Sequence, residues 1–80
     1  MANTQTPNVY RKIRGFIRGI LSKDDDIESI EFVEVKDLGN GKYEVVVRTT
    51  ESDGFVTMYG RFILKYADDG RIKILSVDWF

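Results

Sequence analysis

The chain contains no cysteine and no histidine among its 80 residues. The first absence excludes a disulfide framework, thiol catalysis and thiolate metal sites, and it fits a reducing compartment, so we expect a cytoplasmic protein. The second absence removes the side chain that most often transfers protons near neutral pH. Because no cofactor-binding motif is present either, we expect a protein that is not an enzyme and that binds no metal or cofactor.

Long apolar runs are also missing, and the first part of the chain lacks acids. No apolar run approaches the length that a bilayer requires, so we expect no membrane insertion. Residues 1–23 hold five of the 12 basic residues and no acid, which leaves seven bases against all 13 acids in residues 24–80, or −6. A formal charge of −1 for the whole chain argues against a dedicated polyanion binder.

Eighty residues make one domain with a thin core. We expect residues 1–6 to form a flexible tail and residues 7–80 to form a single domain. A helix is predicted with Thr6 or Asn8 as its cap, Pro7 in its first turn and its end near Ser22. At about 100° per residue, its apolar side chains share one arc of roughly 140°: Val9, Tyr10, Ile13, Phe16, Ile17, Ile20 and Leu21.

Asp24, Asp25 and Asp26 follow the helix, where their charge would meet the unfavourable end of the helix dipole. We therefore place them in a linking turn. The run lacks the alternating ligands and the glycine of a calcium loop, so we interpret it as a solvated connection.

Three turn signals divide the rest of the chain into four strands: Gly39–Gly41, Asp53–Gly54 and Asp68–Gly70. The predicted fold class is therefore α+β, with one N-terminal helix packed on a four-stranded antiparallel meander sheet. Loops of three, two and three residues at these turns put most apolar strand residues on one face, which the helix should cover. That face comprises Val33, Val35, Tyr43, Val45, Val47, Thr49, Met58, Gly60, Phe62, Leu64, Tyr66, Ile72, Ile74 and Ser76.

The same registers make the opposite face apolar as well, and nothing in the chain is left to cover it. Solvated faces of antiparallel sheets are normally polar, and aromatic residues with arginine are typical of protein interfaces. We predict an interface for a second copy in a two-fold dimer, or for another protein. Its predicted residues are Phe32, Val46, Arg48, Tyr59, Arg61, Ile63, Leu75, Val77 and Trp79. The alternative is that bulges at Phe32–Val33 and Ile74–Leu75 let this face partly bury itself.

Two residues of the helix-covered face stand out. Gly60 is predicted either to give the helix room to approach, around Phe16 to Ile20, or to let its strand bend. Asp78 is predicted opposite Gly60, either as a buried base or, more simply, as a hydrogen-bonded or solvated carboxylate.

A basic ridge on the helix suggests an alternative function. Arg11, Arg14 and Arg18 lie beside Gly15 and Gly19, which point away from the apolar arc. Such a ridge could bind anions such as a phosphate backbone. The simpler interpretation is a solvated face with two glycines that weaken the helix.

The open sheet face also supports a nucleic-acid alternative. On this predicted face Arg48 and Arg61 lie beside three aromatic residues, and the set resembles the base-stacking surface of sheet-based RNA binders. The three aromatic residues are Phe32, Tyr59 and Trp79. Glu34 and Glu44 interrupt that surface.

One helix followed by a four-stranded meander resembles the cystatin-like fold, and the segment Arg61–Phe80 resembles the final hairpin of nuclear-transport-factor-two-like domains. This resemblance implies pairing through open sheet faces. The extra helices that wall a ligand cone in that group are absent here, so we expect no small-molecule substrate. The expected function is a protein-interaction module, with a nucleic-acid-associated protein or a small inhibitor as alternatives.

Overall fold

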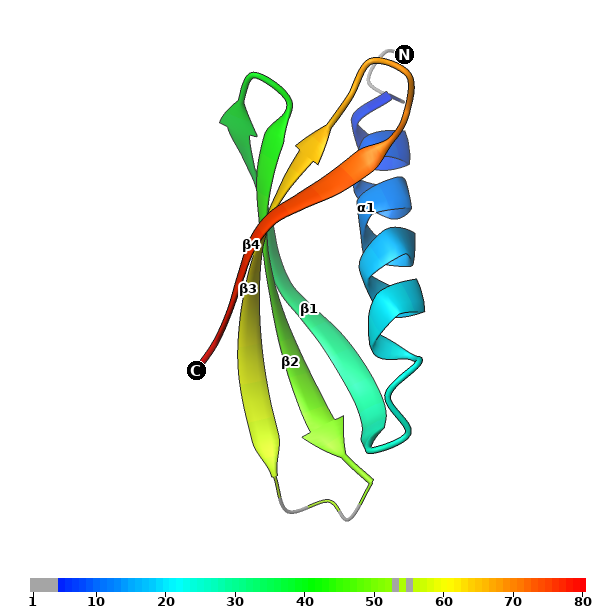
Figure 1. Ribbon diagram of the computed structural model, residues 1–80, viewed down its shortest axis with the longest axis vertical. Coiled ribbons are helices and arrows are strands. Elements are labelled where there is room, and N and C mark those ends of the chain that lie inside the picture. Colours follow the sequence, from blue (N-terminus) through cyan, green and yellow to red (C-terminus); the bar gives the residue numbers. More distant parts are fainter. Residues whose placement is uncertain (1–4, 53, 55) are drawn as a thin grey trace.

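The computed structural model describes residues 5–80 apart from Asp53 and Phe55, and this part of the chain forms one helix followed by four strands. The strands make a single antiparallel sheet in the order β1-β2-β3-β4, which confirms the predicted α+β class and the meander (Figure 1). The elements are α1 (Gln5–Leu21), β1 (Ile27–Gly39), β2 (Lys42–Glu51), β3 (Thr57–Tyr66) and β4 (Ile72–Trp79).

The helix α1 begins earlier than predicted and ends where predicted. Gln5 and Thr6, which we expected in the flexible tail, are helical, so the helix starts ahead of the expected caps Thr6 and Asn8. The rest of that tail, residues 1–4, lies outside the described residues. Beyond Leu21, the Ser22 amide donates to the Arg18 carbonyl at 2.9 Å, and the Asp26 amide donates to the Asp24 carboxylate at 3.0 Å. The three aspartates therefore lie in the predicted linking turn.

The core lies between α1 and the two central strands. The apolar arc of the helix buries Ile13, Ile17 and Leu21, while Val9 and Phe16 pack at its border. From the sheet, Val45 and Val47 of β2 and Phe62 and Leu64 of β3 are buried against them. Burial of this stripe stabilises the helix, because its two exposed glycines and lack of first-turn acids give it little intrinsic stability.

The central hairpin has the predicted register. Tyr43 lies opposite Leu64, Val45 opposite Phe62 and Val47 opposite Gly60. The pairing continues in the same register toward the turn, where the Glu51 amide donates to the Val56 carbonyl at 2.9 Å. Asp53, half of the turn that we predicted here, lies outside the described residues.

Each outer strand has a bulge at a place that the sequence suggested. The strand β1 has two further register shifts, between Ile27 and Ser29 and between Asp37 and Gly39. In β1, Lys36 still lies opposite Glu44, but Val33 has no partner and Phe32 lies opposite Val47. In β4, Ile74 still lies opposite Leu64, but Leu75 has no partner. Because side chains alternate between the two faces, one extra residue sends the rest of each strand to the opposite face.

Five predicted positions are therefore on the wrong face of the sheet, and the first of them, Ser76, lies opposite Ile63 on the open face. Val77 lies opposite Phe62 and Trp79 opposite Gly60, so these side chains, like Phe32, are on the helix-facing side and not on the open face. Asp78 instead lies opposite Arg61 on the open face and is exposed, so it is not a buried base.

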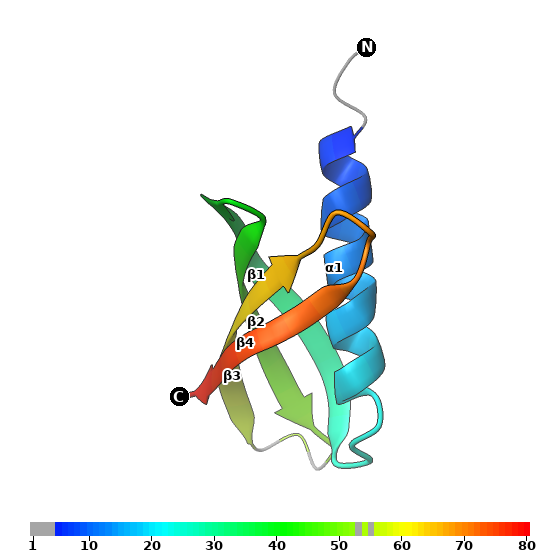
Figure 2. The same cartoon turned by 45° about the horizontal axis from the view of Figure 1, so that its top comes forward.

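The sheet is too wide for one helix. Figures 1 and 2 show β1 running beside α1, while β4 starts near the helix and carries the C-terminus away from it. Ile72 and Ile74, at the start of β4, accordingly pack against the core. At the other end of β3 and β4, Met58 and Trp79 face the helix side and are still 39% and 42% exposed.

Three tyrosines close the end of the core near the start of β2. The rings of Tyr10 and Tyr43 meet edge to face, with centroids 6.1 Å apart. Burial raises the pKa of Tyr43, and the neighbouring Asp37, Tyr10 and Tyr66 raise it further. Tyr43 therefore stays protonated to a higher pH than a free tyrosine.

Gly60 makes room for Trp79 and not for the helix. A Cβ atom at Gly60 would lie 2.8 Å from Cζ3, 3.0 Å from Cε3 and 3.1 Å from Cη2 of the indole. The indole also meets the Phe62 ring edge to face, at 79° and with centroids 6.0 Å apart. The glycine thus lets the indole lie flat against β3.

We expect Gly60→Ala to lower the free energy of unfolding by about 1 to 3 kcal/mol, because the new methyl group overlaps the indole. The displaced ring should also change its fluorescence maximum. Urea titration followed by tryptophan emission measures both. Unchanged stability with an unchanged emission maximum would contradict the placement of Trp79 over Gly60.

The matched control is Gly15→Ala on the outer face of α1, where nothing lies within 4 Å of the added Cβ atom. This change should raise the free energy of unfolding by about 1 kcal/mol, because alanine is the better helix former. The same substitution thus has opposite expected signs at the two sites.

Candidate interaction surface

The open sheet face, meaning the side of the sheet away from α1, carries a row of two charged and two aromatic side chains. Glu31, Arg48 and Tyr59 lie side by side across β1, β2 and β3. Phe80 completes the row, since its amide donates to the Tyr59 carbonyl at 2.8 Å and its carbonyl accepts from the Tyr59 amide at 3.0 Å. The rings of Tyr59 and Phe80 stack with centroids 6.0 Å apart.

Both arginines of this face are held beside glutamates. Arg48 forms an ion pair with Glu31 and donates a hydrogen bond to its carboxylate. This hydrogen bond raises the pKa of Arg48 above its ordinary value. The Arg61 Nε atom lies 3.1 Å from a carboxylate oxygen of Glu44. The Arg61 guanidinium also lies 5.4 Å from the centroid of the Phe80 ring. The face therefore presents paired charges of both signs among aromatic rings.

The structure brings together six of the nine predicted interface residues. Val46, Arg48, Tyr59, Arg61 and Ile63 share the open face, and Leu75 is exposed at the bulge of β4. The other three, Phe32, Val77 and Trp79, lie on the helix-facing side. Sequence reasoning missed Phe80, which an extra residue at Leu75 would have placed on the open face.

A row of lysines crosses the same face at its other end. Lys42, Lys65 and Lys73 lie in register across β2, β3 and β4. The Lys65 ammonium donates to the Asn40 carbonyl at 2.6 Å, which turns it toward the β1–β2 loop. The predicted registers already placed these three residues side by side, so the sequence contained this signal.

The basic ridge of the helix is separate from the open face, because α1 lies on the other side of the sheet. Arg11 and Arg18 are exposed and Arg14 is half-buried. The Arg18 guanidinium lies 5.3 Å from the centroid of the Phe32 ring at the border of the core. Arg18 thus covers part of Phe32, and the ridge and the open face cannot form one continuous site.

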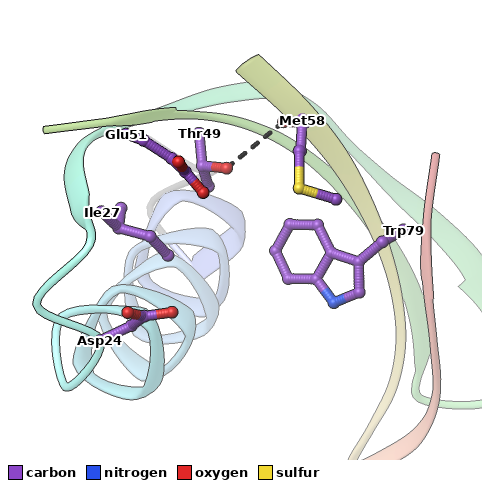
Figure 3. A pocket seen from close by; sticks show the side chains of 6 residues that line it. All are labelled: Asp24, Ile27, Thr49, Glu51, Met58 and Trp79. Atoms are coloured by element: carbon purple, nitrogen blue, oxygen red, sulfur yellow. Dashed lines mark hydrogen bonds between the residues drawn. The ribbon is translucent and has the colours of Figure 1, made fainter. Parts of the chain in front are cut away.

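A pocket of about 250 Å³ opens on the helix-facing side, between the end of α1 and the uncovered ends of β3 and β4. Figure 3 shows the indole of Trp79 and the Met58 side chain along one wall, with Asp24 and Ile27 facing them. Thr49 and Glu51 line it from β2, and the buried Thr49 hydroxyl donates to the Met58 carbonyl at 3.4 Å. The sequence did not predict this pocket, because it exists only once the bulge turns Trp79 inward.

Within the described residues, no group of three or more histidine, cysteine, aspartate or glutamate side chains could hold a metal ion. The same part of the chain has no helix that is long and apolar enough to cross a membrane. No protein-family model, curated protein or solved structure matches this chain. The surfaces described above are therefore the basis for a functional proposal.

Proposed function

We propose that this chain is a non-enzymatic protein-interaction module that forms a two-fold homodimer through its open sheet face. The observation that carries the proposal is the uncovered cluster of Tyr59, Ile63 and Phe80 beside Arg48 and Arg61. Tyr59 is 37% exposed and Phe80 is 61% exposed. Aromatic and arginine side chains in such a cluster are the types that dominate binding energy at protein interfaces.

The charge pattern of the face favours a second copy as the partner. In a two-fold dimer the same patch meets itself, so a surface with charge of one sign would repel its copy. Here Arg48 pairs with Glu31 and Arg61 with Glu44, which leaves both signs available to the partner. Each arginine can then meet a glutamate of the other copy as well as its own.

The thin core also favours dimerisation. The described residues bury only seven apolar side chains, all of them between α1 and the central strands. A domain of this size has little stability to spare, and burial of Val46, Ile63 and Leu75 against a second copy would add to it. Folding and assembly would then be coupled, with stability rising with protein concentration.

Two further parts of the proposal concern classification and location. The helix and curled meander support membership of the cystatin-like and nuclear-transport-factor-two-like fold group, in which pairing through open sheet faces is common. A cytoplasmic location is supported by the absence of cysteine. Neither point identifies a biological process, since fold does not determine function.

We predict that Ile63→Lys gives a monomer, because the ammonium group would lie at the centre of the apolar contact. Sedimentation velocity at micromolar concentration should show a dimer for the wild-type protein and a monomer for this variant. Thr57→Lys is the matched control, since Thr57 is exposed at the margin of the same face, and it should remain a dimer. A monomeric wild-type protein at all attainable concentrations would contradict the homodimer.

The lysine row favours a second candidate, the binding of single-stranded nucleic acid to the same face. Lys42, Lys65 and Lys73 could follow a phosphate backbone, while the stacked Tyr59 and Phe80 rings could receive bases. The basic ridge with Arg11, Arg14 and Arg18 is an alternative anion-binding surface on the opposite side of the molecule.

Fluorescence anisotropy with a labelled single-stranded oligonucleotide tests this candidate. We expect binding that weakens steeply with added salt. The double variant Lys65→Glu, Lys73→Glu should abolish it if the sheet face is the site, whereas Arg11→Glu, Arg14→Glu should abolish it if the helix is the site. No change in anisotropy at low salt would eliminate both surfaces.

A further inference from the structure

We propose that the pocket lined by Asp24, Ile27, Thr49, Glu51, Met58 and Trp79, here called the Trp79 pocket, binds an alkylammonium group. This inference does not rest on the proposed homodimer. The pocket opens on the helix-facing side of the sheet, so pairing through the open face would leave it accessible. The group could belong to a free amine or to a lysine side chain of a partner, and both offer the same chemistry to the pocket.

The charges around the Trp79 pocket select a cation. Its lining contains two carboxylates, Asp24 and Glu51, and no basic residue. The C-terminal end of α1 lies beside it, and the dipole of a helix adds partial negative charge at that end. Asp25 and Asp26 follow Asp24 in the same connection, so an anionic ligand would be repelled.

Trp79 supplies a fixed aromatic surface for that cation. Gly60 lets the indole lie flat on β3, and the Phe62 ring meets it edge to face, so the position of the indole is set by packing. Nevertheless the side chain is exposed enough to take a ligand, and Figure 3 shows the ring facing Asp24 and Ile27 across the pocket. An ammonium group between the indole and the carboxylates would gain both cation–π and ionic attraction.

The size and the apolar wall specify the rest of the ligand. A pocket of about 250 Å³ is smaller than the 300 to 1,000 Å³ typical of drug-sized ligands. It suits a short aliphatic stem, which Ile27, Met58 and Trp79 can contact while the ammonium group reaches the carboxylates. Two carboxylates beside thioether, indole and alkyl groups are a poor set for a hard metal ion, which prefers six or more oxygen ligands.

An NMR titration with n-butylammonium chloride tests the proposal, read from the Trp79 indole N–H and the Met58 methyl signals. We expect saturable shifts of both signals at millimolar concentration. The uncharged n-butanol and the anion butyrate, with similar stems, should bind at least about tenfold more weakly, because they lack the positive charge. Equal binding of n-butanol would overturn the proposal, as would the absence of any shift with n-butylammonium.

Isosteric variants separate the charge effect from loss of folding. The double variant Asp24→Asn, Glu51→Gln keeps the shape of the pocket and should weaken n-butylammonium at least about tenfold. Glu34→Gln is the control, since Glu34 is an exposed carboxylate on the open face, and it should leave the affinity unchanged. Unchanged affinity in the double variant would refute the proposed role of the carboxylates.

A comparison of two probes distinguishes the source of the ligand. Lysine blocked at both backbone ends has the same ammonium tip but adds peptide groups next to the stem. Tighter binding of blocked lysine than of n-butylammonium would assign the pocket to a partner's lysine, and the reverse order would assign it to a free amine. Because these titrations can be run on the Ile63→Lys variant, failure of the homodimer would not affect their interpretation.

Discussion

The sheet offers more apolar surface than one helix can cover, and the two bulges at Val33 and Leu75 decide how that surface is divided. Each bulge adds one unpaired residue, and the strand beyond it then presents its other side chains to the helix. Phe32 thereby joins the border of the core, and Val77 and Trp79 move to the helix-facing side. The local break in hydrogen bonding is offset by the packing of Phe32 against the core and of the Trp79 indole over Gly60.

The same division produces both surfaces that we propose to be functional. Because Phe32, Val77 and Trp79 lie on the helix-facing side, the open face has a smaller apolar centre than the sequence predicted. Paired charges surround this centre, and such a surface suits contact with a second copy of itself. On the helix-facing side, α1 stops at Leu21 and leaves the ends of β3 and β4 uncovered. Trp79 is turned inward there with no helix above it, and the gap becomes the Trp79 pocket beside two carboxylates.

Most of the fold could be predicted from the sequence because its signals are local. The helix follows from seven apolar residues on one arc, and the central register follows from a short turn that leaves Val45 and Val47 on one face with Phe62 and Leu64. The consequence of a bulge is not local. Leu75 is left unpaired if the free energy gained when Trp79 packs over Gly60 exceeds the free energy lost with the strand hydrogen bonds. That balance depends on residues far apart in sequence. The alternation of side chains along the strands suggested bulges at Phe32–Val33 and Ile74–Leu75. The resulting positions of Phe32, Trp79 and Phe80 depend on tertiary packing.

The register of β4 beyond Leu75 is the central claim of this account, and nuclear Overhauser effects in the uniformly labelled protein test it most directly. We expect contacts between the indole protons of Trp79 and the Hα protons of Gly60, together with cross-strand contacts between Phe62 and Val77. Without the bulge, Trp79 would lie opposite Tyr59 on the open face. Contacts between the Trp79 and Tyr59 rings, with none between Trp79 and Gly60, would contradict the account.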